Sequence, residues 1–95
     1  MTPALYMVTN KPRGVLYTGV TSSLPHRIDQ HRRGDGAAFC RRYNLTQLVL
    51  AEFYPTMLEA IAREKAIKEW KRLWKIELIE QSNPEWVDLY DRLNC

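Results

Sequence analysis

Runs of aromatic and β-branched residues near the N-terminus predict two β-strands. Residues 4–9 (ALYMVT) and residues 15–20 (VLYTGV) have the composition that is typical of strands. The residues between them, NKPRG, are turn formers, so the two strands are expected to form a hairpin. A third apolar run at residues 47–54 predicts another strand, which Pro55 ends.

Apolar positions with helical spacing predict the remaining elements. Residues 24–33 follow a run of candidate N-cap residues, and the helix that they predict ends at Gly34. A basic, glycine-containing loop is expected at residues 34–44. A second helical pattern opens at Thr56, which matches a capping box with Glu59.

The second helical pattern extends to about residue 81, which is too long for one ordinary helix. Two helices, or one helix bent near residues 70–72, are therefore expected. Asn83 and Pro84 interrupt the chain, and residues 85–94 predict a short terminal helix. The element order is β-β-α-β-α-α, which indicates a small antiparallel sheet with helices packed on it and hence an α+β fold.

Length and composition narrow the class of protein. With 95 residues and 11.2 kDa the chain has room for one domain, expected to span residues 1–95. Its hydrophobic fraction of 45% is typical of a globular chain. It contains no apolar run of about 18 residues and no secretory signal pattern, so no membrane association is expected. Cys40 and Cys95 lack zinc-site spacing, which favours reduced thiols and a cytoplasmic location.

Positive charge is concentrated in the N-terminal half of the chain. Residues 1–44 carry seven basic and two acidic side chains, whereas residues 45–95 carry seven basic and nine acidic ones. A basic half suits a polyanion such as a nucleic acid. A solvated, charged surface without a partner is the alternative interpretation.

Two tyrosines in the expected hairpin are candidate functional residues. Tyr6 and Tyr17 lie in the two strands, close to opposite one another if the turn centres near residues 11–12. Gly19 shares the face of Tyr17 and leaves room for a close approach to that face. A cross-strand aromatic pair with only a structural role is the alternative.

Arg27 and His31 fall on the apolar face of the first expected helix. An arginine with a histidine one turn later suits an oxyanion or a phosphate, although an exposed helix position is the alternative for His31. Glu64 also shares a helix face with apolar residues, where a carboxylate needs a partner or a cation. A salt bridge with Lys68, four residues later, is its structural alternative.

Two phenols, one arginine, one histidine and one carboxylate form a set that can carry out metal-assisted phosphodiester hydrolysis. A single carboxylate is enough to hold a largely hydrated Mg²⁺. The metal would stabilise charge on the leaving oxygen, and the arginine would neutralise the phosphoryl oxygens. A tyrosine with its pKa lowered by the metal or by nearby cations could take the proton from the attacking water.

The same residues resemble the motifs of the GIY-YIG nuclease family. Residues 4–6 (ALY) stand in the first motif position, residues 17–19 (YTG) stand in the second, and residues 60–68 (AIAREKAIK) are similar to the segment with the family's metal-binding glutamate. The likeness covers roughly residues 5–89. It looks closest to short stand-alone bacterial members, which are often labelled excinuclease-like or endonuclease-like. It implies a three-stranded antiparallel sheet flanked by helices.

The resemblance also implies a role for each site residue. Tyr6 and Tyr17 would surround the attacking water, and which of them acts as the base stays open. Arg27 would stabilise the phosphate, His31 would be an auxiliary polar group, and Glu64 would bind the divalent metal, Mg²⁺ or Mn²⁺. The implied site consists of Tyr6, Tyr17, Arg27, His31, Glu64 and, as a further auxiliary candidate, Asn83.

The function implied is that of a metal-dependent endonuclease or nickase acting on DNA, with RNA as a further substrate class. It is expected to be structure-directed, with little sequence specificity, in DNA repair or recombination; a monomer is assumed. A non-catalytic nucleic-acid-binding module is the alternative. A protein-interaction module built on Trp70 and Trp74 is a third hypothesis, although tryptophans at helical spacing are typically core residues. The expected nucleic-acid-binding residues are Arg32, Arg33, Arg41, Arg42 and Tyr43.

Overall fold

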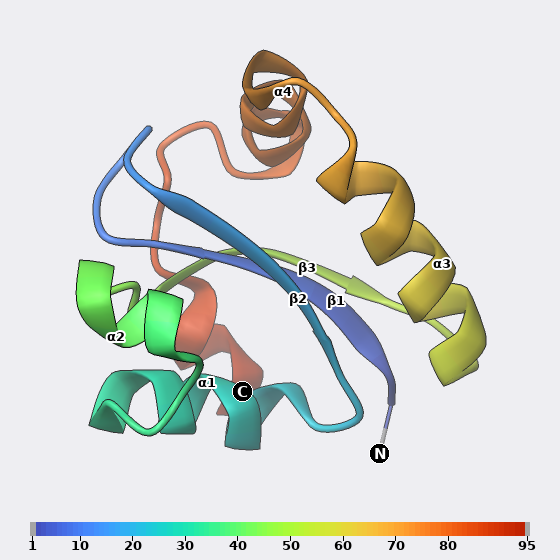
Figure 1. The fold of residues 1–95 in the computed structure, drawn as a ribbon, viewed down its shortest axis with the longest axis horizontal. Helices are drawn as coiled ribbons and strands as arrows, with labels where there is room; N and C mark the ends of the chain where they lie inside the picture. The colour runs from blue at the N-terminus through green and yellow to red at the C-terminus, as the bar shows by residue number, and fades with distance from the viewer. Residues whose placement is uncertain (1, 95) are drawn as a thin grey trace.

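The structure is a computed structural model, and it describes residues 2–94. Strands cross the middle of the molecule and helices lie on both sides of them (Figure 1). In chain order the elements are β1 (Ala4–Thr9), β2 (Leu16–Thr21), α1 (Leu24–Arg33), α2 (Ala38–Tyr43), β3 (Gln47–Phe53), α3 (Met57–Lys68), α4 (Arg72–Ser82) and the 3₁₀-helix η1 (Leu89–Asn94).

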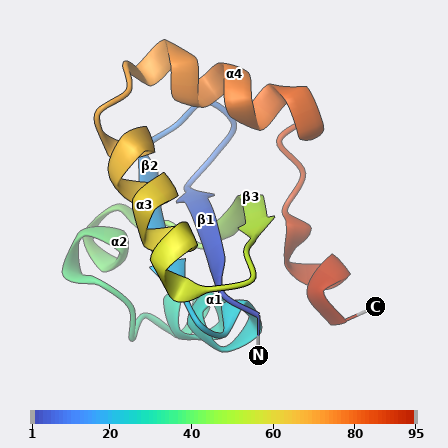
Figure 2. The ribbon, with the colours of Figure 1, turned by 90° about the vertical axis from the view of Figure 1, so that its right-hand side faces the viewer.

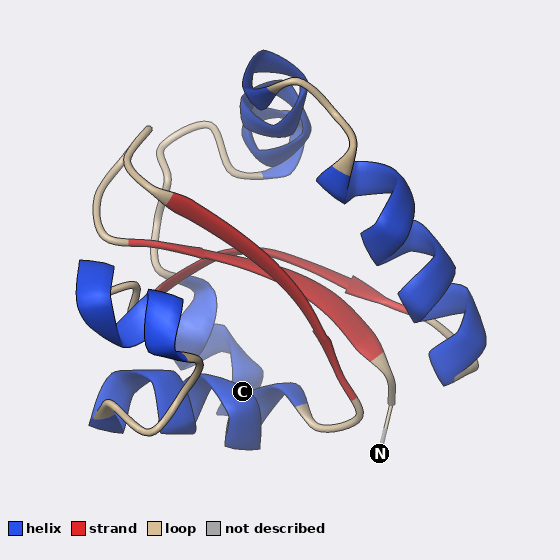
Figure 3. Cartoon of the chain, in the orientation of Figure 1, coloured by secondary structure: helices blue, strands red, loops and turns tan. Residues whose placement is uncertain are grey.

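The sheet has three antiparallel strands in the order β2-β1-β3 (Figure 3). Every residue of the central strand β1 is buried, because both faces of this strand are covered. The pairing of β1 with β3 shifts between Met7 and Val8, where β3 carries an extra residue in a bulge. This arrangement confirms the α+β fold and the three-stranded antiparallel sheet flanked by helices.

Helices cover the two faces of the sheet and enclose two separate cores. We call the face covered by α1, α2 and η1 the α1 face, and the face covered by α3 and α4 the α3 face; Figure 2 shows α3 lying across β1 and β2. Successive residues of β1 alternate between the cores, as the pleat of a strand requires. The α1-face core contains Ala4, Tyr6, Val8, Leu24, Ile28, Cys40, Leu45 and Leu48. The α3-face core contains Leu5, Met7, Val49, Leu50, Ile67, Ile76, Ile79 and Trp86.

Elements with strong local signals lie where the sequence predicts them. Helix α1 spans residues 24–33 as expected, and Gly34 ends it with a left-handed φ of 82° that a glycine adopts without strain. The Thr56 hydroxyl accepts a hydrogen bond from the backbone N–H of Glu59, as the capping box predicts. The expected division of the long helical pattern near residues 70–72 is confirmed by the break between α3 and α4.

The prediction of a loop at residues 34–44 is wrong, because this stretch contains helix α2. The helix is short, and it is held by Cys40, which is buried in the α1-face core, and by Asn44, which ends it with a φ of 57°. Burial raises the pKa of the Cys40 thiol to about 11, so the thiol is neutral. Cys95 lies outside the described residues.

The terminal helix expected at residues 85–94 is shorter than predicted. Only Leu89–Asn94 is helical, as a 3₁₀-helix, and Trp86 before it adopts a left-handed φ of 56° that no α-helix contains. The second strand also begins one residue later than predicted, at Leu16. Across residues 2–94, no helix is long and apolar enough to cross a membrane.

Candidate active site

Tyr6 is fully buried at the centre of the α1 face. It pairs across the sheet with Gly19, and a Cβ atom at Gly19 would lie 2.6 Å from the Tyr6 hydroxyl oxygen. The absent side chain at Gly19 therefore makes room for the phenol itself. The hydroxyl lies 3.0 Å from Nε2 of His31, which is only 4% exposed, so the alternative of an exposed histidine is wrong.

Tyr17 lies beside Tyr6 on the same face of the sheet. The register pairs Tyr17 with Val8, so the two tyrosines are diagonal neighbours and not directly opposite one another. The centroid of the Tyr17 ring is 6.4 Å from that of Tyr6 and 6.1 Å from that of His31. Tyr17 is half-buried, so it is the phenol of the pair that keeps some exposed surface.

Arg27 supplies the positive charge of this cluster. It lies one turn before His31 on α1 and is half-buried. Burial lowers the pKa of His31, and the charge of Arg27 lowers it further. Burial also raises the pKa of Tyr6 far above its ordinary value, while Arg27 opposes part of that increase. At neutral pH the cluster therefore contains a neutral imidazole, a protonated phenol and a guanidinium.

Two residues that the sequence analysis did not single out border the cluster. The Nδ1 atom of His31 has no hydrogen-bond partner among the described residues, and Gly36 packs so closely that a Cβ atom there would overlap the imidazole. The Phe39 ring on α2 lies 6.2 Å from the Tyr17 ring. An aromatic residue inside a basic, glycine-containing stretch was the sequence signal for Phe39.

Glu64 lies on α3, which packs along β1 and the edge strand β2. Its Oε2 atom is 3.4 Å from Nζ of Lys68, so the salt bridge that was the structural alternative is present. The same Lys68 ammonium lies 6.0 Å from the centroid of the Tyr17 ring. Lys68 therefore connects Glu64 to the tyrosine cluster around the edge of the sheet.

A groove of about 320 Å³ opens beside Tyr17 and Lys68. Two of the side chains that line it are cationic and none is acidic, so the groove suits a ligand that carries phosphate. Its lining residues are Leu16, Tyr17, Thr18, Phe39, Lys68 and Lys75.

Glu64 offers the chemistry of a site for a hydrated divalent ion. Across residues 2–94, no group of three or more histidine, cysteine, aspartate and glutamate side chains could hold a metal. One carboxylate fits an ion such as Mg²⁺, which keeps several waters, and does not fit a closed zinc site. The Lys68 ammonium beside this carboxylate shows that it accepts a cationic partner.

The two arginines at the end of α1 are engaged within the protein. Arg32 forms an ion pair with Asp88 at 2.9 Å. Arg33 lies 3.5 Å from Asp29 and 3.8 Å from Asp35. Their positive charges are therefore offset by neighbouring carboxylates, which weakens this part of the expected nucleic-acid surface.

The basic residues of α2 are placed differently. Arg41 and Arg42 form no ion pair with any acidic side chain in the part of the chain that the structure describes. The guanidinium carbon of Arg42 lies 5.6 Å from the centroid of the Tyr43 ring, and Tyr43 is 40% exposed. Helix α2 therefore presents its positive charge and an aromatic ring to solvent.

Asn83 holds a loop in place at the C-terminal end of α4. Its side-chain N–H groups donate to the carbonyl oxygens of Val49 and Val87 at 3.1 and 2.8 Å. Its Oδ1 atom accepts from the backbone N–H of Val87 at 2.9 Å. The amide is buried and occupied in joining β3 to the chain after α4, so this placement does not bring Asn83 into the tyrosine cluster.

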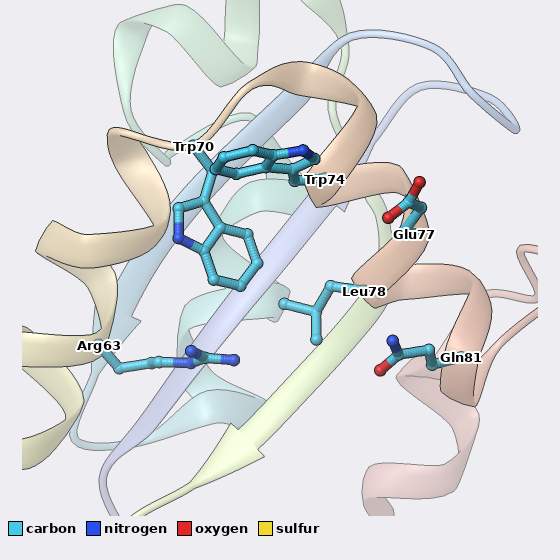
Figure 4. A pocket seen from close by; sticks show the side chains of 6 residues that line it. All are labelled: Arg63, Trp70, Trp74, Glu77, Leu78 and Gln81. Carbon is cyan, nitrogen blue, oxygen red and sulfur yellow. The ribbon is translucent and has the colours of Figure 1, made fainter.

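A second pocket, of about 520 Å³, lies between α3 and α4. Figure 4 shows Leu78 in the middle of this pocket, the rings of Trp70 and Trp74 at one end and Arg63 reaching in from α3. Trp74 is 49% exposed, so the expectation that both tryptophans belong to the core is wrong. This pocket contains none of the residues of the tyrosine cluster.

Comparison with known proteins identifies the family of this chain and agrees with its fold. Residues 2–77 match the model of the GIY-YIG catalytic domain. UPF0213 proteins of Staphylococcus aureus strains Mu50 and N315 are 38% identical over 68 residues, which cover 72% of this chain and 83% of theirs. A solution NMR structure of a UPF0213 protein from Bacillus halodurans is 28% identical, with a TM-score of 0.59 over 93% of each chain. These relatives carry the name UPF0213 and not that of an excinuclease. The chain belongs to the GIY-YIG family.

Proposed function

We propose that this protein is a metal-dependent endonuclease or nickase that hydrolyses phosphodiester bonds in DNA. The observation that carries the proposal is the meeting of two phenols, an imidazole and a guanidinium beside a cationic groove. Lys68 lines that groove and holds the carboxylate of Glu64. Membership of the GIY-YIG family supports this chemistry.

Glu64 and Arg27 are the proposed electrostatic groups. Glu64 would hold Mg²⁺ or Mn²⁺, an ion that stabilises negative charge on the leaving oxygen when it is bound. Arg27 would neutralise the phosphoryl oxygens as charge develops on them. Lys68 would release the carboxylate of Glu64 and turn toward a phosphate in the groove that it lines.

Tyr17 is the proposed acceptor of the proton from the attacking water, a role that it would take as the phenolate, after its own hydroxyl proton has passed to solvent. It is half-buried and lines the groove, whereas Tyr6 is fully buried. Burial raises the pKa of Tyr6, which keeps that phenol protonated. Tyr6 would donate its hydroxyl proton to Nε2 of the neutral His31, and this hydrogen bond would fix the position of both rings.

Plasmid cleavage tests the proposal. Supercoiled plasmid and branched oligonucleotides are incubated with the protein and Mg²⁺, Mn²⁺ or EDTA. We expect metal-dependent nicking that Glu64→Gln and Arg27→Ala each reduce by about a hundredfold or more. Glu77→Gln is the matched control, because it removes an exposed carboxylate from the pocket of Figure 4 and leaves the groove intact.

Circular dichroism spectra establish that each variant is folded before its activity is compared. Nicking that Glu64→Gln leaves unchanged would contradict the assignment of this carboxylate. A wild-type protein that binds DNA in a salt-sensitive manner and never cuts it would support the non-catalytic binding module instead.

A further inference from the structure

Two aromatic side chains on α2 remain exposed beside the candidate active site. Phe39 is 44% exposed and Tyr43 is 40% exposed, and their ring centroids are 4.8 Å apart. Phe39 also lies 6.2 Å from Tyr17. The rings of Tyr17, Phe39 and Tyr43 therefore form a continuous row from the tyrosine cluster to the surface of the protein. We call Phe39 and Tyr43 the aromatic platform.

Positive charges accompany the aromatic platform along its length. The guanidinium carbon of Arg42 lies 5.6 Å from the centroid of the Tyr43 ring at one end, and Lys68 and Lys75 line the groove beside Phe39 at the other. The residues that line this groove include no carboxylate. Such a surface complements a ligand that alternates planar rings with negative charges, and a nucleotide chain is that ligand.

We propose that the aromatic platform stacks the bases of an unpaired strand and delivers it to the groove beside Tyr17. In a duplex each base face is covered by its neighbours, so only an unpaired strand offers a free face to Phe39 and Tyr43. The groove volume of about 320 Å³ is at the lower end of the range for small ligand sites. This inference rests on the proposed nuclease function and assigns its substrate to nucleic acid with unpaired nucleotides.

The positions of Phe39 and Tyr43 determine which features of a nucleic-acid strand the aromatic platform can recognise. Phe39 and Tyr43 are four residues apart on one helix, so their rings lie on the same side of α2. An aromatic ring can stack on the π-face of any base. Stacking does not distinguish the bases, because it makes no hydrogen bonds to their edges. Binding is therefore expected to depend on strand pairing and on salt far more than on base sequence.

Fluorescence anisotropy in EDTA tests this inference without cleavage. The probes are a labelled oligothymidine of about 15 nucleotides, the matching oligouridine and a blunt duplex of the same length. We expect tighter binding of oligothymidine than of the duplex, and about tenfold weaker oligothymidine binding for each of Phe39→Leu and Tyr43→Leu. Tyr43→Phe keeps the ring and should restore the affinity. Phe53→Ala is the matched control, since Phe53 is 56% exposed and lies at the end of β3, outside this groove.

The outcomes separate this inference from the proposed function. Leucine variants that bind oligothymidine as the wild type does would overturn the aromatic platform, even if Glu64 proves essential for cutting. Equal losses of affinity for oligothymidine and for the duplex would overturn it as well. A platform that binds unpaired bases must, when it is removed, weaken the binding of oligothymidine more than that of the duplex. Selective losses in a protein that never cuts DNA would support the platform and contradict the nuclease. Tyr43→Leu keeps the test decisive if Phe39→Leu fails to fold. Comparison of oligothymidine with oligouridine shows which sugar the surface accepts.

Discussion

The two faces of the sheet bury side chains of different chemical character, although β1 is fully covered on both faces. On the α3 face, β1 contributes Leu5 and Met7 to a core of apolar residues. On the α1 face, the same strand contributes Tyr6, whose hydroxyl meets the buried imidazole of His31. Each of these three β1 side chains is fully buried. The strand is therefore the same, and the two layers of helices differ in what they place against it.

The difference indicates that the α1 face is built for more than folding. A buried hydrogen bond contributes about 0.5–1.5 kcal/mol to stability, whereas a buried polar atom left without a partner costs about 1–3 kcal/mol. His31 carries such an atom, Nδ1, and no described residue satisfies it. The α3 face shows that this strand can be packed with apolar side chains alone. Substitutions in the apolar α3-face core should therefore change stability without changing chemistry, whereas substitutions among the polar residues buried on the α1 face should change both.

Ile79→Ala should have the largest effect on stability. Ile79 is fully buried on α4 in the α3-face core, and its truncation leaves a cavity that costs about 2–5 kcal/mol of the free energy of unfolding. Urea denaturation measures this loss. Among molecules that remain folded, DNA binding and nicking should stay within about twofold of the wild type, because Ile79 lines neither the groove nor the α1-face core that contains Tyr6. A selective loss of nicking would break the comparison between the faces.

Gly19→Ala should have a smaller effect on stability and a larger effect on function. The added Cβ atom would lie 2.6 Å from the Tyr6 hydroxyl oxygen and must displace that phenol from His31. Overpacking of this kind costs about 1–3 kcal/mol. We expect nicking by folded protein to fall by about tenfold or more, because the tyrosine cluster is displaced.

Gly34→Ala is the control for Gly19→Ala. Gly34 has a φ of 82°, and a Cβ atom added there would have no atom within 4 Å, so the substitution strains the backbone by about 1–2 kcal/mol without touching the cluster. Urea denaturation and nicking are compared for both variants. Equal losses of nicking at equal losses of stability would mean that the cluster has no special role.

Local signals explain which parts of this fold could be predicted from sequence. Helix α1 begins at a proline-compatible position and ends at Gly34, so its bounds follow from residues within the helix and next to it. Ala37 gives helix α2 no side-chain cap, so this helix has a local signal only at its end, where Asn44 adopts a left-handed φ of 57°. It depends on Cys40, which packs against strands from both sides of it in the sequence. The sequence therefore predicted a loop there. Of the two rings of the aromatic platform, Tyr43 was expected to bind nucleic acid, whereas Phe39 was not singled out.

In the candidate site, too, local spacing predicted some features, whereas contacts between distant residues could not be predicted. The helical spacing of Arg27 and His31 placed both residues on the face that meets the sheet, as the structure has them. The hydrogen bond from Tyr6 to His31 joins residues 25 positions apart, and the ion pair of Arg32 with Asp88 joins residues 56 positions apart. Neither contact follows from periodicity, because each depends on how the helices pack on the sheet.

The pH dependence of stability should show the smallest effect and sharpens the comparison further. Burial, and then the charge of Arg27, lower the pKa of His31 below the value of about 6.5 that an unfolded chain gives it. Below that value the unfolded state binds more protons than the folded state, so the contribution of His31 is complete above about pH 6.5 and is lost as the pH falls toward its folded pKa. Tyr6 and Tyr17 also face the imidazole, and burial raises the pKa of Tyr6, which therefore stays protonated over this range.

Urea denaturation between about pH 7.5 and about pH 5 measures this contribution. We expect the wild-type midpoint to fall with pH and His31→Gln to flatten part of that slope, since glutamine binds no proton. His26→Gln is the matched control, because it replaces a histidine that is exposed on the same helix, away from the buried imidazole. An equal slope in the wild type and in His31→Gln would mean that burial on the α1 face does not hold the imidazole neutral, and the chemical difference between the two faces would then be smaller than their packing indicates.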